Sequence, residues 1–277
     1  MKGGLDRKIA DLRRRLGAMP SAAVAFSGGA DSAYLAAEAR AALGARAVAI
    51  TVDTPLLARE ERRDAAAVAR RIGIRHLVLK ADPLSDPRVA VNAPDRCYRC
   101  KRMVFRRILE AAREAGIETV VDGTQADDAG ERRPGRRALR ELGVRSPLAE
   151  AGFTKADVRA ASRRRRLPTA GKPSNACLAT RFRYGTRLEP ARLRAVGRAE
   201  EAIRALGFPQ VRLRVEGDAG RLELPVASLA RAAAPARRAL LLRIARRAGL
   251  RGLVLDLRGY RSGSMDDALR PRSGHTL

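Results

Sequence analysis

The chain has 277 residues, 45% of them hydrophobic, so it can bury a substantial core in one large domain or two smaller ones. No apolar run approaches the ~20 residues that a membrane span needs, and residues 1–16 are charged throughout, unlike a secretory signal. Three cysteines, an odd number, argue against a secreted disulfide framework. We therefore expect a soluble, cytoplasmic protein with no membrane partner.

The formal net charge is +27, a balance that is typical of nucleic-acid-binding proteins. Only six of the 57 basic residues are Lys, however, which indicates a compositional bias toward Arg. Aromatic residues make up 3% of the chain and Trp is absent, so platforms for stacked bases are scarce. We therefore expect the charge to collect small anionic substrates, and nucleic acid is not the expected partner.

In chain order, residues 5–16 have the apolar spacing of a covering helix. Short β-rich runs then alternate with helical ones, and this alternation predicts a parallel sheet covered on both faces. The first predicted strand ends at Phe26, and the later ones span 46–52, 75–79, 119–121 and 143–148. The predicted helices span 32–43, 58–72 and 98–115, with another that begins at Thr154. The fold class is therefore α/β, with a five-stranded parallel sheet in a domain of residues 1–185.

The composition changes after Thr186. Helical patterns at 189–206 and 226–248 alternate with β-rich runs at 211–215, 221–224 and 252–257, and a hairpin turn at 217–220 joins the first two runs. This order predicts a separate, smaller α+β domain over residues 186–277. We expect the tail after Gly263 to be poorly ordered.

A glycine turn follows the first predicted strand, and its residues are Ser27, Gly28, Gly29, Ala30, Asp31 and Ser32. Backbone amides of such a turn and of the helix that follows, together with the helix dipole, hold phosphate groups closely. A Walker-type loop adds a Lys before the helix, and this turn has none. The amino-acid sequence of this turn instead resembles the PP-loop of ATP pyrophosphatases. We predict an ATP site here, against the alternative of an ordinary strand-to-helix turn.

Acidic turns follow two other strands. Asp53 follows the run 46–52, and Asp122 and Gly123 follow the run 119–121. Ligands bind beyond the carboxyl ends of parallel strands, so we predict these residues beside the glycine turn as ATP-binding residues. Asp122 is also a candidate for contact with Mg²⁺, because phosphate activation needs a hard cation with oxygen ligands. The alternative roles are turn formation for Asp122 and capping for Asp53.

The three cysteines form an unusual set. Cys97 and Cys100 begin a helix among basic residues, which favours thiolates, and Cys177 lies in an irregular loop at 172–185. The pair alone fits a redox disulfide, half a zinc site or part of an iron-sulfur site. Zinc would need a fourth ligand, and the only His residues are His76 and His275. Three thiolates fit a cluster with one iron left open, and three buried apolar thiols are the alternative.

Motifs along nearly the whole chain carry a family resemblance. They occupy residues 27–32, 51–55, 96–101, 122–128, 133–135, 146–148, 172–181 and 259–264. Together they resemble the LarE family of ATP-dependent sulfurtransferases, which help to build the nickel-pincer nucleotide cofactor of lactate racemase. The resemblance implies that a carboxylate of pyridinium-3,5-biscarboxylic acid mononucleotide is adenylylated, pyrophosphate is released and sulfur then replaces AMP, twice over.

The resemblance also implies roles for particular residues. Cys177, Asp31 and Arg181 match catalytic positions, and ATP and Mg²⁺ are the implied cofactors. In single-cysteine members the thiol at the position of Cys177 gives up its own sulfur and becomes dehydroalanine. Members with three cysteines hold a 4Fe-4S cluster, here on Cys97, Cys100 and Cys177, whose open iron carries an extra sulfide. A sulfide donor, other proteins of nickel-pincer biosynthesis and a homo-oligomeric state are the implied partnerships.

Charged residues of the C-terminal domain complete the predicted site. Arg212 and Arg214 lie two residues apart on one face of a strand, where they are able to clamp the mononucleotide phosphate. Carboxylates at Glu200, Glu223 and Asp256 are candidate ligands of a divalent metal, with surface charge as the alternative.

Rival functions share parts of this pattern. A tRNA thiolase shares the loop, the adenylylation and in some cases a three-cysteine cluster, but it predicts an added RNA-binding module that the sequence does not reveal. An amide-forming ligase of the NAD- or GMP-synthetase kind shares the loop and needs no cysteine trio. A non-enzymatic iron-sulfur or RNA-binding protein has no use for the loop.

Overall fold

The computed structural model describes residues 2–127, 134–173, 175–261 and 265, and the chain divides into two compact units, 1–175 and 176–277. The division falls after Asn175, whereas the sequence placed the domain boundary at residue 185. The tail beyond Gly263 lies almost wholly outside the described residues. Among the helices that are described, none is both long enough and apolar enough to cross a membrane.

The first unit is built on a four-stranded parallel sheet in the order β3-β2-β1-β4. The strands are β1 (Ala22–Ala25), β2 (Ala47–Asp53), β3 (Arg75–Lys80) and β4 (Thr119–Val121). The helices are α1 (Lys2–Gly17), α2 (Ala30–Leu43), α3 (Arg59–Ile72), α4 (Pro87–Ala90), α5 (Arg96–Glu114), α6 (Pro134–Glu141), α7 (Pro147–Glu150) and α8 (Lys155–Arg164). The predicted α/β class is confirmed.

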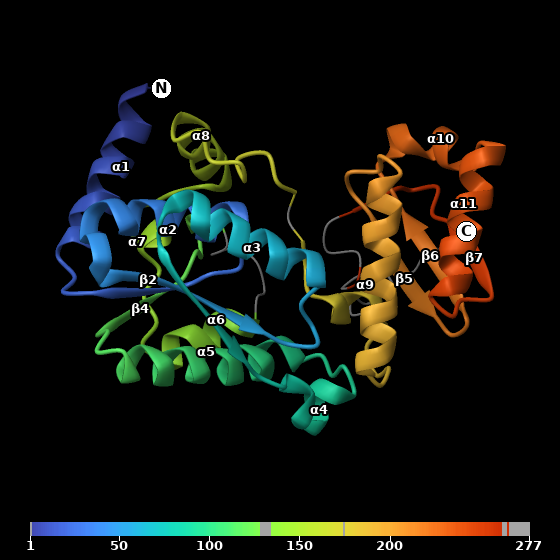
Figure 1. Ribbon diagram of the computed structural model, residues 1–277, viewed down its shortest axis with the longest axis horizontal. Coiled ribbons are helices and arrows are strands. Elements are labelled where there is room, and N and C mark those ends of the chain that lie inside the picture. The colour runs from blue at the N-terminus through green and yellow to red at the C-terminus, as the bar shows by residue number, and fades with distance from the viewer. Residues whose placement is uncertain (1, 128–133, 174, 262–264, 266–277) are drawn as a thin grey trace, which may run out of the picture. The chain divides into compact units, whose positions relative to one another are not determined.

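Helices cover both faces of this sheet (Figure 1). One core cluster joins the strands to α1, α2, α3 and α8, and it includes Leu12, Leu16 and Leu35. A second cluster joins the opposite face to α5 and α6 through Phe105, Ile108 and related side chains. Strands buried on both faces explain the nearly continuous apolar runs of β1 and β2.

The prediction of a fifth strand at 143–148 is wrong. Only Arg145 bridges to Val121, with its amide nitrogen 3.1 Å from the carbonyl oxygen of Val120 and its carbonyl oxygen 2.9 Å from the amide nitrogen of Asp122. Pro147 then begins α7 and has no N–H to continue a ladder of hydrogen bonds. The segment therefore leaves the sheet after one pairing.

The helix predicted to begin at Thr154 is confirmed as α8. Thr154 caps α8, and its hydroxyl accepts from the amide of Asp157 while the Asp157 carboxylate accepts from the amide of Thr154. The predicted covering helix is α1, and it is tied to α2 through the fully buried carboxylate of Glu38. That carboxylate accepts from Arg13 of α1 and from Arg165 just after α8.

The second unit is a small mixed sheet with helices. Its strands are β5 (Arg212–Glu216), β6 (Ala219–Glu223) and β7 (Gly252–Leu255), and its helices are α9 (Pro190–Ala205), α10 (Leu229–Ala233) and α11 (Pro235–Arg247). The hairpin of β5 and β6 is antiparallel, as predicted, and β7 pairs parallel to β6. The long helix predicted at 226–248 is interrupted, because Pro235 begins a new helix after the extended residue Ala234.

Candidate functional site

The glycine turn lies between the carboxyl end of β1 and the amino end of α2. Phe26 continues the pairing of β1, since its amide donates to the carbonyl oxygen of Ile50 at 2.8 Å. Ser27 and Ser32 then close the turn, with their hydroxyl oxygens 3.1 Å apart and the Ser27 amide donating to the Ser32 hydroxyl at 3.2 Å. The first turn of a helix directs its N–H groups outward, so this turn has the form of an anion-binding loop.

Two glycines of the site are required by close packing. Gly28 has a φ of +69°, and a Cβ there would lie 2.6 Å from the Cα of Ala65 on α3. A Cβ at Gly123 would lie 3.0 Å from the amide nitrogen of Ser32. The end of β4 therefore lies directly against the first turn of α2. The structure thus brings the predicted residues Gly123 and Asp122 to the glycine turn.

Asp122 is 6% exposed and accepts two hydroxyl hydrogen bonds. Thr124 donates to one carboxylate oxygen at 2.5 Å, and Ser146 donates to the other at 2.6 Å. These bonds fix the carboxylate at the strand end, and buried charge of this kind requires such partners. Asp53 lies at the end of β2, where it forms an ion pair with Arg62 of α3. The ATP-binding roles of both remain predictions.

The first two cysteines lie at the amino end of α5. Neither is in a disulfide, and Cys97 is exposed. The buried guanidinium of Arg96 lies 3.5 Å from the sulfur of Cys97 and also contacts the side chain of Asn92. Cys177 is not in a disulfide either, but it belongs to the second unit, so convergence of the three sulfurs remains a prediction.

Arg181 organises the backbone around Cys177 in the second unit. Its side chain is fully buried, and its guanidinium donates to the carbonyl oxygen of Ala176 at 2.6 Å and to that of Cys177 at 3.1 Å. The hydroxyl and amide of Thr180 donate to the Cys177 carbonyl as well, at 2.9 and 3.0 Å. Arg181 thus holds the chain that carries the thiol, which suits a positioning role.

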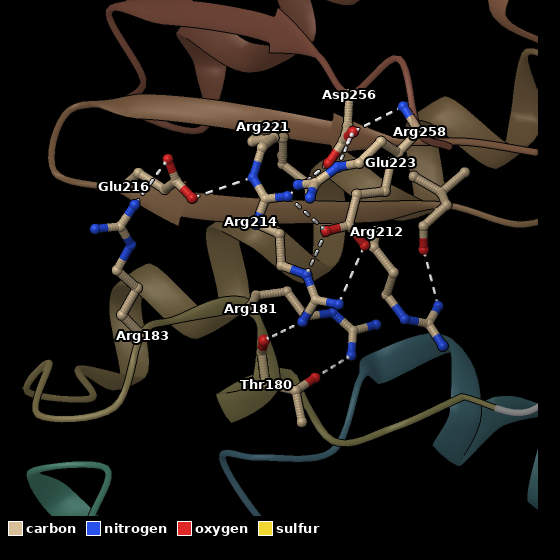
Figure 2. Close-up of polar contacts among 12 residues, drawn as sticks. Thr180, Arg181, Arg183, Arg212, Arg214, Glu216, Arg221, Glu223, Asp256 and Arg258 are labelled. Atoms are coloured by element: carbon tan, nitrogen blue, oxygen red, sulfur yellow. Dashed lines mark hydrogen bonds and ion pairs between the residues drawn. The ribbon is translucent and has the colours of Figure 1, made fainter. Parts of the chain in front are cut away.

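Guanidinium groups and carboxylates form one cluster along β5 and β6 (Figure 2). Glu200 accepts from Arg181 at 2.9 and 2.8 Å, and Glu223 accepts from Arg214 at 3.0 and 3.1 Å. Arg214 also donates to the Thr180 carbonyl oxygen at 2.5 Å. The two predicted phosphate ligands therefore lie within an ordered polar network rather than on an open surface.

Arg212 is 5% exposed and lies 5.1 Å from the centroid of the Tyr260 ring. Burial and the positive charge of Arg181 lower the pKa of the Arg212 guanidinium. Arg214 is a second neighbouring cation that lowers this pKa, whereas the carboxylate of Glu200 raises it. An anion bound there would relieve the repulsion, so the cluster suits a phosphate group.

The three carboxylates predicted as metal ligands all pair with arginine. Glu200 pairs with Arg181, Glu223 with Arg214, and Asp256 accepts from Arg221 at 2.6 Å (Figure 2). Among the described residues, no three or more His, Cys, Asp or Glu side chains gather as a group that would hold a metal ion. The metal role of these residues stays a prediction, and the structure does not bring them together as a ligand set.

We expect Glu200→Gln to destabilise the second unit by about 3–5 kcal/mol, because it leaves the buried Arg181 guanidinium without its charged partner. Denaturant unfolding monitored by circular dichroism measures this loss. The matched control is Asp218→Asn, which breaks a pair with Arg251 whose side chains are 73% and 88% exposed. That change should cost less than about 1 kcal/mol. Equal unfolding midpoints for the two variants would contradict the conclusion that Glu200 neutralises a buried Arg181 guanidinium.

Sequence reasoning missed several partners of the predicted residues. Ser146 supports Asp122, Tyr260 lies over Arg212, and Lys172 lies at the glycine turn. For Lys172 a signal existed, because Lys is rare in this Arg-rich chain. Local spacing contains no trace of the other two partnerships, which join residues far apart in the sequence.

The fold and the loop define a class of enzymes that bind ATP with a PP-loop. Comparison with known families agrees, since the asparagine synthase family matches residues 10–246. A pyridinium-3,5-bisthiocarboxylic acid mononucleotide synthase of Lactiplantibacillus plantarum is 36% identical over 96% of each chain. An uncharacterized protein of Synechocystis is 38% identical over 96% of this chain and 99% of its own length.

A tRNA-specific 2-thiouridylase of Zymomonas mobilis is also similar, at 35% identity, but only over 36% of this chain and 32% of its own length. The two full-length matches are therefore the informative ones. The chain belongs to the LarE family, whose member in L. plantarum is the mononucleotide synthase.

Proposed function

We propose that this chain is an ATP-dependent sulfurtransferase that converts pyridinium-3,5-biscarboxylic acid mononucleotide into the bisthiocarboxylate. The observation that carries the proposal is the end-to-end similarity to the L. plantarum synthase. The glycine turn on α2 and the Cys177 segment supply the two kinds of chemistry that such a reaction needs. The substrate is a small mononucleotide, with a role in nickel-pincer cofactor biosynthesis.

The first step is adenylylation at the glycine turn. A substrate carboxylate oxygen attacks the α-phosphorus of ATP, and the bond to the β-phosphate breaks, so that pyrophosphate leaves with the electron pair. Ser27, Gly28, Gly29 and the first turn of α2, with Asp31 and Ser32, hold the departing phosphates through backbone amides and hydroxyls. Mg²⁺ would be held near Asp122, whose carboxylate the hydroxyls of Thr124 and Ser146 orient.

In the second step sulfur attacks the activated carbonyl carbon and AMP leaves, and a second cycle thiolates the other carboxylate. Arg181 fixes the backbone on both sides of Cys177, so the thiol is presented from an ordered segment. The donor set of three thiols, none of them in a disulfide, fits an iron-sulfur cluster on Cys97, Cys100 and Cys177. Such a cluster, when bound, would supply a replaceable sulfide at its open iron.

The mononucleotide phosphate is assigned to Arg212 and Arg214. Both lie on β5 within the cluster of guanidinium groups and carboxylates, and Arg212 lies beside Tyr260. Planar guanidinium groups bind phosphate oxygens in pairs. Further partners follow from the same proposal: a sulfide donor, other proteins of nickel-pincer biosynthesis and further copies of this chain.

Replacing Arg212 and Arg214 together with Ala should raise the apparent KM for the mononucleotide by about 10- to 100-fold, because one charged hydrogen bond, here from Arg212, contributes about 1.5–3 kcal/mol and Arg214 is already engaged by Glu223. Steady-state pyrophosphate release measures this change. Arg212→Ala alone keeps the Arg214–Glu223 pair and should account for much of the effect. The control is Arg183→Ala, whose side chain is 73% exposed and pairs with Glu216.

The salt dependence of binding affinity distinguishes a small mononucleotide substrate from RNA. A ligand bound through one or two phosphates loses little affinity between low and moderate salt, whereas a polyanion held at many phosphates loses it steeply. The alternative function is tRNA thiolation, for which the partial similarity to the 2-thiouridylase is the supporting observation. Thiolated tRNA as a product, with no reaction on the mononucleotide, would overturn the proposal in favour of that alternative.

A further inference from the structure

The glycine turn has no cation of its own. Residues 21–39 contain neither Lys nor Arg, although the chain has 57 basic residues. A loop that holds the β- and γ-phosphates of ATP must balance several negative charges. In a P-loop, a Lys next to the glycines meets this need. Any such cation must therefore come from another part of the fold.

Lys172 lies where that cation is needed. Its Nζ is 3.4 Å from the carbonyl oxygen of Gly28 in the glycine turn and 2.7 Å from a carboxylate oxygen of Asp64. The Lys172 side chain is 24% exposed, so it is partly enclosed but remains accessible to a ligand. Lys172 is 144 residues beyond Gly28 in the chain, so the local sequence of the turn does not reveal this cation.

The surroundings hold the ammonium in place. Asp64 lies on α3, one residue before Ala65, the residue against which Gly28 packs. One helix therefore both shapes the turn and fixes the lysine beside it. An ammonium has three N–H donors, and the two described acceptors, Gly28 and Asp64, take two of them. A phosphate oxygen suits the third, because Lys binds phosphate as a compact point charge.

We infer that Lys172 is the phosphate-binding cation of this glycine turn, and that it contacts the β- or γ-phosphate of ATP and then pyrophosphate. The inference rests on the proposed use of ATP. As the bond between the α-phosphorus and the bridging oxygen breaks, the electron pair stays on pyrophosphate, whose charge the ammonium offsets. No proton moves. Asp64 acts as a positioning residue that keeps Nζ at the turn.

The alternative is that the Lys172–Asp64 ion pair only stabilises the shape of the turn, and this alternative makes a different prediction. The Lys172–Asp64 pair is partly exposed, with 43% of the Asp64 side chain accessible, and such pairs contribute little to stability. If the pair only held the turn in shape, Asp64→Asn would also break it and would weaken pyrophosphate binding as much as Lys172→Met does. If Lys172 contacts the outer phosphates, its loss should weaken pyrophosphate and spare AMP, which has only the α-phosphate.

Titration calorimetry with magnesium pyrophosphate and, separately, with AMP tests the inference. Lys172→Met keeps the apolar stem and removes the charge, and it should weaken pyrophosphate binding by about 10- to 100-fold while changing AMP binding less than about twofold. Lys172→Arg keeps the charge and should restore most of the pyrophosphate affinity. The matched control is Lys155→Met, an exposed lysine at the start of α8 in the same unit.

Three results would overturn the inference: unchanged pyrophosphate affinity in Lys172→Met, equal losses for pyrophosphate and AMP in that variant, or a loss of pyrophosphate affinity in Asp64→Asn as large as that in Lys172→Met. A melting temperature within a few degrees of wild type shows that Lys172→Met is folded, and Lys172→Gln, which also removes the charge, serves in its place if it is not. The binding readout needs no sulfur transfer. Wild-type protein that binds pyrophosphate but forms no thiolated mononucleotide would therefore contradict the proposed function and leave this inference standing.

Discussion

Gly28→Ala is expected to lower ATP-dependent pyrophosphate release by about a hundredfold or more. The new Cβ would meet the Cα of Ala65 at 2.6 Å, and backbone cannot move aside as a flexible side chain does. The turn must shift instead, and displacement of a binding group by about 1 Å costs about 10²-fold in rate. Substrate-dependent pyrophosphate release at saturating ATP and mononucleotide is the measurement.

The control for backbone strain is Gly73→Ala at the end of α3. Gly73 has a φ of +73°, close to the +69° of Gly28, but a Cβ there meets nothing within 4 Å. Both substitutions carry the cost of a left-handed residue, about 1–2 kcal/mol, and only Gly28→Ala also carries the clash. Gly73→Ala should therefore keep its activity. Equal activity of the two variants would refute the packing argument and weaken the assignment of the turn to ATP.

Removal of any one of the three cysteines is the second change with a large expected effect. Anaerobic reconstitution of the wild type should give about four irons per chain and a brown colour, because three thiolates hold such a cluster and leave one iron open. Cys97→Ala should lose both the colour and multiple-turnover sulfur transfer. Tyr98→Phe is the matched control, since it changes the residue between the two thiols on α5 without removing a ligand.

The competing route uses Cys177 alone. Each chain would then donate one sulfur, and Cys177 would afterwards be about 34 Da lighter through loss of H₂S. Iron-free protein that turns over once with this mass change would contradict the cluster. In that case Cys97→Ala would keep its single turnover, whereas Cys177→Ala would lose it. Intact-protein mass spectrometry after a single turnover distinguishes the two routes.

Much of the fold followed from local patterns. Alternating β-rich and helical runs predicted the parallel sheet, and four of its five expected strands are present. The fifth was mispredicted because only Arg145 of the segment 143–148 pairs with the sheet, and Pro147 then begins α7. The long helix at 226–248 was mispredicted for a related reason, since Pro235 starts a separate helix.

For the candidate site, the sequence identified residues but not their partners. It placed the glycine turn between a strand and a helix, and the structure places that turn between β1 and α2. It described Arg214 as a phosphate ligand and Glu223 as a metal ligand, whereas the structure pairs the two side chains directly. Side chains on neighbouring antiparallel strands meet according to register, which period-2 patterns alone do not fix.

The sequence by itself determined the fold class, the position of the glycine turn and the three thiols, because each depends on residue types at short spacing. Only the tertiary structure decided that Gly123 packs on the first turn of α2, that Ser146 supports Asp122 and that Lys172 reaches Gly28. These contacts join residues 24 to 144 positions apart. They arise because parallel strands bring their carboxyl ends to one edge of the sheet, where distant loops share the same space.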